Sequence, residues 1–133
     1  MTFVPDNILR HMDPAERKKR GRAGMTQAEA TRTETLRIER QDHADFANYL
    51  LLKGIWFEHE NPTRRSTSRR GWPDFRCFYF GHRFLEVEFK IRPNKLSREQ
   101  EEVRAMLESF GFAYVVAYSL SEAIEATHTH LLS

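Results

Sequence analysis

The spacing of apolar residues in the first half of the chain predicts a long helix followed by a short strand. Residues 26–53 open with Thr-Gln-Ala-Glu, the spacing of a capping box, and continue with an apolar stripe at helical spacing up to Gly54. Glu39 falls on this stripe, so an acid is expected to point inward. Residues 55–59 predict a strand, and residues 60–71, with Pro, Ser, Thr and four arginines, predict a loop. The stripe contains Leu36, His43, Phe46, Ala47 and Leu50.

The middle of the chain predicts a β-hairpin. The segment FRCFYFGHRFLEV has aromatic and branched residues on both sides of the turn-prone pair Gly81-His82. Successive side chains of a strand point to opposite faces of the sheet. We therefore expect the second strand to direct its apolar face, residues 85, 87 and 89, to the core. Its polar face would carry Glu86, Glu88 and Lys90.

The last third of the chain predicts a helix, a strand and a second helix. Residues 97–100 (SREQ) form another capping box, and apolar residues then recur at helical spacing as far as Gly111. Residues 113–118 form a continuous apolar strand, and Ser119 with Glu122 opens the final helix. The element order α-β-β-β-α-β-α predicts an α/β fold, in which helices flank a mixed four-stranded sheet. A crossover helix before the last strand makes that strand parallel to a neighbour.

Length and composition limit the possible classes of protein. At 133 residues the chain is long enough for one compact core, so we expect one domain at residues 26–133. Residues 1–25, rich in charge and poor in apolar periodicity, are expected to be a basic flexible arm. No run approaches the roughly 20 apolar residues of a membrane helix, and no signal peptide is visible, which predicts an intracellular protein without a membrane partner. The single cysteine, Cys77, excludes an internal disulfide.

The two strands of the hairpin are expected to bring acidic residues together. Asp74 opens the first strand, Glu88 lies on the second, and Lys90 follows Glu88 on the same face. Carboxylates beside an ammonium group can hold a hard divalent cation and a phosphate, which suggests a metal-dependent nuclease. The alternative is that Pro73-Asp74 is an ordinary turn and that Glu88 and Lys90 are a surface ion pair.

The basic residues are clustered although the net charge is only +2. One block lies at residues 17–22, and a second immediately precedes Gly71. We expect the second block to contact DNA phosphates, with an affinity that falls steeply with salt; the alternative is a solubilising loop. No recognition helix or zinc finger is visible, so recognition of DNA shape is expected rather than of base sequence. The second block consists of Arg64, Arg65, Arg69 and Arg70.

Three segments resemble motifs of the PD-(D/E)xK nuclease superfamily, most closely the small stand-alone VRR-Nuc proteins of phages and bacteria. Residues 71–75 (GWPDF) resemble the G-x-P-D segment, residues 87–90 (VEFK) the E-x-K strand, and residues 96–100 (LSREQ) the L-S-x-x-Q that opens the next helix. Glu39 resembles the helical acid of the family. The resemblance covers residues 35–125 and implies a restriction-endonuclease-like core in a protein of the bacterial or phage-infected host cytoplasm.

The resemblance also implies a metal site. A Mg²⁺ or Mn²⁺ ion would be held by Asp74, Glu88 and the main-chain carbonyl of Phe89, with Glu39 contributing directly or through water. Mg²⁺ accepts such a set because it prefers oxygen ligands and retains several waters. The reaction implied is hydrolysis of a phosphodiester bond by in-line attack.

Two further residues are implied in catalysis. Lys90 would steady the attacking water or the developing negative charge. Gln100 would contact substrate or water near Lys90, or would serve only as the capping-box partner of Ser97. His43 lies one turn beyond Glu39, but a lone inward histidine is more often a hydrogen-bonded core residue, so we leave it out of the site.

The resemblance suggests substrate and assembly as well. Similar stand-alone proteins form homodimers that cut branched DNA such as four-way (Holliday) junctions, so a structure-selective endonuclease and a homodimer are expected. Two alternatives stay open. One is a non-catalytic nucleic-acid-binding module with the same fold, and the other is an end-processing or restriction-type nuclease.

Overall fold

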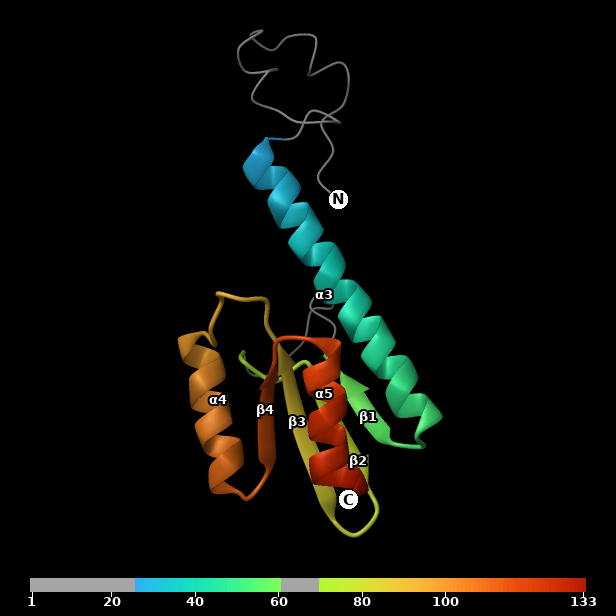
Figure 1. Cartoon of the computed structure of the whole chain (residues 1–133). Coiled ribbons are helices and arrows are strands. Elements are labelled where there is room, and N and C mark those ends of the chain that lie inside the picture. The colour runs from blue at the N-terminus through green and yellow to red at the C-terminus, as the bar shows by residue number, and fades with distance from the viewer. Residues whose placement is uncertain (1–25, 61–69) are drawn as a thin grey trace, which may run out of the picture. The chain divides into compact units, whose positions relative to one another are not determined.

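The computed structural model of the chain describes residues 26–60 and 70–133, shown in colour in Figure 1. The chain separates into two compact units, residues 1–40 and 41–133, and the boundary lies within helix α3 (Gln27–Leu52). The expected N-terminal arm lies outside the described residues. No described helix is both long enough and apolar enough to cross a membrane.

The unit of residues 41–133 is built on a mixed four-stranded sheet (Figure 1). Its spatial order is β1 (Trp56–His59), β2 (Phe75–Tyr79), β3 (Arg83–Phe89) and β4 (Ala113–Ala117). The first three strands are antiparallel, and β4 is parallel to β3. The predicted α/β class, the mixed sheet and the parallel last strand are thereby confirmed.

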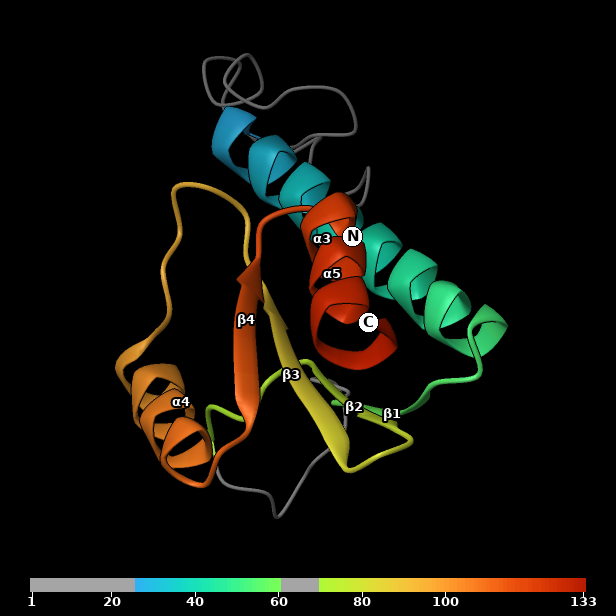
Figure 2. The same ribbon diagram turned by 60° about the horizontal axis from the view of Figure 1, so that its bottom comes forward.

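Three further elements complete this unit. Helix α4 (Arg98–Ser109) connects β3 to β4, and α5 (Leu120–Thr127) follows β4. A π-helical turn, η2 (His128–Leu132), continues α5 and was not predicted. The helices α4 and α5 lie on opposite sides of the sheet (Figure 2).

One face of the sheet packs against α5 and the C-terminal half of α3. Phe46 and Leu50 of α3 are fully buried there, as the apolar stripe predicted. The apolar face of β3 lies in the same cluster, because side chains alternate along the strand. Leu36, which was expected on the buried stripe, belongs to the other compact unit and is 44% exposed. The cluster also includes Phe75, Leu85, Val87, Phe89, Ala123, Ala126 and Leu131.

On the opposite face of the sheet, α4 packs against β4. Val103 and Leu107 of α4 pack on Tyr114 of β4 in a second buried cluster. Glu86 and Glu88 point to this face and are only 2% and 3% exposed. The predicted alternation of β3 is confirmed, but its acidic face, expected on the sheet surface, is buried: Arg76 contacts Glu86, and Gln100 of α4 contacts Glu88.

Candidate functional site

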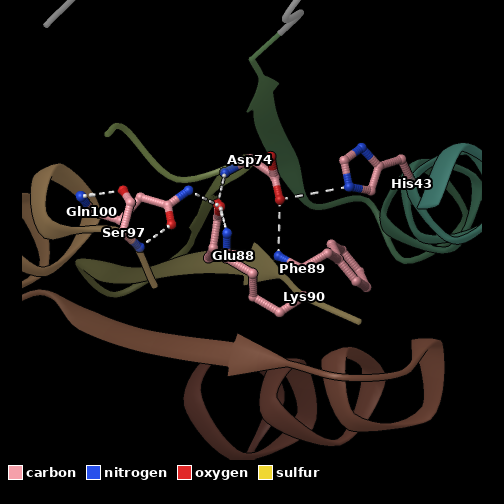
Figure 3. Close-up of polar contacts among 7 residues, drawn as sticks. All are labelled: His43, Asp74, Glu88, Phe89, Lys90, Ser97 and Gln100. Carbon is pink, nitrogen blue, oxygen red and sulfur yellow. Dashed lines mark hydrogen bonds and ion pairs between the residues drawn. The ribbon is translucent and has the colours of Figure 1, made fainter. Parts of the chain in front are cut away.

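Two acids from neighbouring strands meet at the end of β3, as Figure 3 shows. Asp74 directly precedes β2, and Glu88 is the penultimate residue of β3. Glu88 Oε2 accepts a 3.0 Å hydrogen bond from the amide of Asp74, and Asp74 Oδ2 accepts a 2.8 Å hydrogen bond from the amide of Phe89. Each carboxylate is therefore held by a main-chain amide at or next to the other acid: Glu88 by the amide of Asp74, and Asp74 by the amide of Phe89.

The main chain of Phe89 also faces this site. Its amide points to Asp74, and the N–H and C=O of one strand residue point to the same side of the strand. The carbonyl oxygen of Phe89 is consequently directed to the side on which Asp74 lies. The predicted trio of Asp74, Glu88 and the Phe89 carbonyl is brought together by the β2–β3 pairing.

The two carboxyl groups differ in their tendency to ionise. Burial raises the pKa of Glu88 to about 9, and the negative charge of Asp74 adds to the rise, while Lys90 opposes it. Burial alone would raise the pKa of Asp74 too, but the hydrogen bond and charge of His43 and the amide of Phe89 lower it. At neutral pH the pair therefore carries a proton on the Glu88 side, as expected when like charges share a buried site.

Lys90 and Glu86 have different partners on the acidic face of β3. Lys90 Nζ lies 3.9 Å from Glu88 Oε1, so the ammonium group stands beside the candidate site. Glu86 instead accepts bonds of 2.9 and 3.1 Å from Arg76 Nε. The Arg76 guanidinium in turn lies over the ring of Trp72, 4.9 Å from its centroid. Glu86 is thus held in an ion pair with Arg76, apart from Asp74 and Glu88.

Gln100 connects α4 to the acids. Its Oε1 accepts a 2.8 Å hydrogen bond from the amide of Ser97, which completes the predicted capping box at the start of α4. Its Nε2 donates a 2.6 Å hydrogen bond to Glu88 Oε1. The capping-box role is confirmed, and the same side chain also contacts Glu88; its contact with substrate or water near Lys90 stays a prediction.

Sequence reasoning left out one side chain that the structure places at the site. His43 of α3 has its Nε2 3.5 Å from Asp74 Oδ2 (Figure 3). Its Nδ1 lies 3.1 Å from Nε2 of His59, the last residue of β1. Burial lowers the pKa of His59, and the charge of His43 lowers it further. The available signal was the position of His43 on the apolar stripe, three residues before the buried Phe46.

The other predicted site residues lie in the other compact unit, outside the described residues or in an exposed turn. Glu39 belongs to the compact unit of residues 1–40, so it has no defined place relative to the site. Arg64, Arg65 and Arg69 lie outside the described residues, and Arg70 is exposed in the turn before Gly71. Among residues 26–60 and 70–133, no three His, Cys, Asp or Glu side chains form a ready-made metal-binding group.

Comparison of the chain with protein-family models, with curated proteins and with solved structures found no match.

Proposed function

We propose that this protein is a divalent-metal-dependent DNA endonuclease with a restriction-endonuclease-like core of the PD-(D/E)xK type. The observation that supports the proposal best is the mutual fixation of Asp74 and Glu88 by backbone amides, with Lys90 beside them. These are the acids and the lysine of the motifs that resemble VRR-Nuc proteins. The alternative was that Glu88 and Lys90 form a solvated ion pair on the surface. Glu88 is only 3% exposed, which argues against that alternative.

The residues at the site suit a hard divalent cation. Two carboxyl groups share a buried position. Burial raises the pKa of Glu88 to about 9, and repulsion by the negative charge of Asp74 adds to the rise. A cation held by Asp74, Glu88 and the Phe89 carbonyl would relieve that repulsion and release the proton. No third acidic or histidine side chain completes a cluster in the described part of the chain. Mg²⁺ and Mn²⁺ tolerate this, because water fills the remaining coordination positions.

Each side chain then has a defined task. Asp74, Glu88 and the Phe89 carbonyl would hold the Mg²⁺ or Mn²⁺, which would supply acidification of a water and withdrawal of charge from the scissile phosphate. Lys90, 3.9 Å from Glu88, supplies a positive charge where the pentacovalent phosphate becomes more negative. Gln100 keeps the Glu88 carboxyl in place by its 2.6 Å hydrogen bond. The chain thus contributes binding, orientation and charge stabilisation.

Cleavage assays test this proposal. Labelled four-way junction, flap, duplex and single-stranded DNA are incubated with the full chain in Mg²⁺, in Mn²⁺ or in EDTA. We expect metal-dependent cutting that Asp74→Asn and Lys90→Ala reduce by at least about 100-fold, while Lys53→Ala, a control at an exposed lysine, has no effect. DNA binding without metal-dependent cutting would support a non-catalytic binding module instead.

The preference for branched DNA and the homodimeric state enter the proposal through the resemblance to stand-alone VRR-Nuc proteins. Paired active sites would place symmetric nicks across a four-way junction. Light scattering measures the oligomeric state, and a junction labelled on two strands shows whether both nicks occur in one encounter. A monomer that cuts linear duplex as fast as junctions would favour the end-processing or restriction-type alternative.

A further inference from the structure

We propose that a cavity beside Asp74 receives one unpaired DNA base that carries an exocyclic amino group, as cytosine, adenine and guanine do. The inference rests on the endonuclease function proposed above and names the class of substrate for it. The cavity has a volume of about 440 Å³, within the range of about 300 to 1,000 Å³ typical of sites for small ligands. It is lined by Glu58, His59, Glu60, Trp72, Pro73 and Arg76.

The cavity lies next to the acids of the candidate site. Pro73 forms part of its wall, and Asp74 is the next residue in the chain. The amide of Glu60 donates a 2.9 Å hydrogen bond to the carbonyl oxygen of Asp74, which ties another part of the wall to the same residue. A nucleotide that flanks a phosphate held at Asp74 and Glu88 is therefore the part of the DNA that can reach this cavity.

Trp72 and Arg76 give the cavity a flat surface. The Arg76 guanidinium lies over the Trp72 ring, with 4.9 Å between Cζ and the ring centroid. Arg76 Nε is held by Glu86 at 2.9 Å, and Trp72 packs against the buried cluster of α4 and β4. Both flat groups are therefore fixed before any ligand binds. Unpaired bases stack on aromatic rings and on guanidinium planes of this kind.

The charges of the lining favour a base over a phosphate group. Glu58 and Glu60 contribute two carboxylates, whereas the charge of Arg76 is balanced by Glu86. This excess of negative charge repels a phosphate. Carboxylates instead accept hydrogen bonds from the amino groups of bases, and thymine has no amino group.

The base must also be unpaired. In duplex DNA, pairing and stacking cover the edge and both faces of a base, so it reaches a protein pocket only when it leaves the stack. Branched DNA offers such bases where its strands separate, which connects the cavity to recognition of DNA shape. The rival explanation is a surface hollow in which the contacts among Trp72, Arg76 and Glu86 only stabilise the sheet.

Binding measurements in EDTA test the base preference apart from any metal. The probes are three DNA duplexes that differ only at one bulged position, which carries cytosine, thymine or an abasic site. Cytosine and thymine are both pyrimidines, so the difference between them isolates the amino group. Fluorescence anisotropy with the full chain should show about tenfold tighter binding of the cytosine bulge than of the other two. Equal affinity for the cytosine and thymine bulges would overturn the inference.

Substitution of the two acids separates base recognition from general electrostatics. Glu58→Ala combined with Glu60→Ala removes negative charge, so affinity for every duplex should rise, but the preference for cytosine should disappear. Glu58→Gln combined with Glu60→Gln keeps two acceptor oxygens and should retain part of the preference. The control is Glu125→Ala, at an exposed acid of α5 that does not line the cavity, and it should keep the full preference. A full preference in the double alanine variant would contradict the role of the acids.

A measurement on the unchanged chain does not depend on any variant folding. In NMR spectra, the indole N–H signal of Trp72 should shift more with the cytosine bulge than with the thymine bulge. The signal of Trp56, which is 82% exposed and does not line the cavity, should shift equally with both. A difference at Trp56 alone would place the base elsewhere and overturn the inference.

The two proposals fail in different ways. Metal-dependent cutting without any preference for the cytosine bulge defeats only the base pocket. No binding of any duplex, together with no metal-dependent cutting, defeats the proposed function itself.

Discussion

Gln100 and Glu88 are joined by a 2.6 Å hydrogen bond that runs from the first turn of α4 to the acidic face of β3. The same Gln100 side chain accepts the amide of Ser97 through its oxygen, so the orientation of the amide group is determined at both ends. The start of α4 and the geometry of the candidate site are thus set together. This coupling links a local helix signal to the proposed chemistry.

Substitutions of Ser97 and of Gln100 should have different effects on stability and on DNA cleavage. Ser97→Ala loses the cap and should cost about 1 kcal/mol of unfolding free energy without slowing DNA cleavage. Gln100→Ala loses the cap partner and also frees Glu88, so cleavage should fall by roughly 10- to 100-fold. Urea denaturation and single-turnover cleavage measure the two quantities. If both variants cut DNA at the wild-type rate, Gln100 serves only α4.

The raised pKa of Glu88 predicts how the stability of the metal-free protein depends on pH. Its pKa of about 9 in the folded chain exceeds the ordinary value of 4.5, chiefly because of burial. The contribution of Glu88 is therefore full below pH 4.5 and is lost as pH rises towards 9. The lowered pKa of Asp74 acts in the opposite sense, but only at pH values below 3.8.

Melting curves in EDTA between pH 5 and 9 test this. Glu88→Gln resembles the protonated acid in shape and cannot ionise, so the difference in melting temperature between this variant and the wild type should grow with pH. Both proteins share all other titrating groups, which cancel in the comparison. A constant difference across this range would show that Glu88 is ionised throughout.

The Arg76–Glu86 pair should be important for stability because the carboxylate is almost completely buried. Glu86 is 2% exposed and its Arg76 partner 29%, with 2.9 Å between them. Arg76→Ala leaves a buried carboxylate without its cation, which should cost about 3 kcal/mol. The matched control is Arg98→Ala in the exposed Arg98–Glu102 pair, expected to cost under about 1 kcal/mol. Equal losses in denaturant titrations would contradict the difference in burial.

Gly71 lies where the turn before Asp74 approaches the backbone of α4. Its φ is +91°, and a Cβ there would stand 2.5 Å from the carbonyl oxygen of Glu99. Gly111 has the same φ, with no heavy atom within 4 Å of a Cβ. Gly111→Ala should therefore show only the cost of the unusual backbone conformation, about 1 to 3 kcal/mol. Gly71→Ala should be clearly less stable in denaturant titrations and should cut DNA more slowly, because the turn must move away from α4. Equal stabilities would mean that the contact with Glu99 yields at no cost.

The sequence by itself determined the positions of the main helices and strands and the proximity of Asp74 to Glu88. The period of apolar residues fixed the helices and strands, and the hairpin spacing placed Asp74 beside Glu88, because backbone geometry repeats regularly over short distances. Alternation along β3 also assigned the apolar residues to one face and the acids to the other. The resemblance of residues 71–75, 87–90 and 96–100 to nuclease motifs added an interpretation of those acids.

Only the tertiary structure decided which residues surround Asp74 and Glu88. Alternation assigns Glu88 to a face of β3 but does not say what packs on that face. In the folded chain Gln100 of α4 contacts Glu88 there, and burial raises the pKa of Glu88. A helical stripe likewise contains both Glu39 and His43, but only the packing of α3 on Phe75 and Phe89 brings His43 to Asp74. Such contacts join residues far apart in the chain, and their geometry depends on how whole elements pack. Short-range periodicity carries no information about that packing.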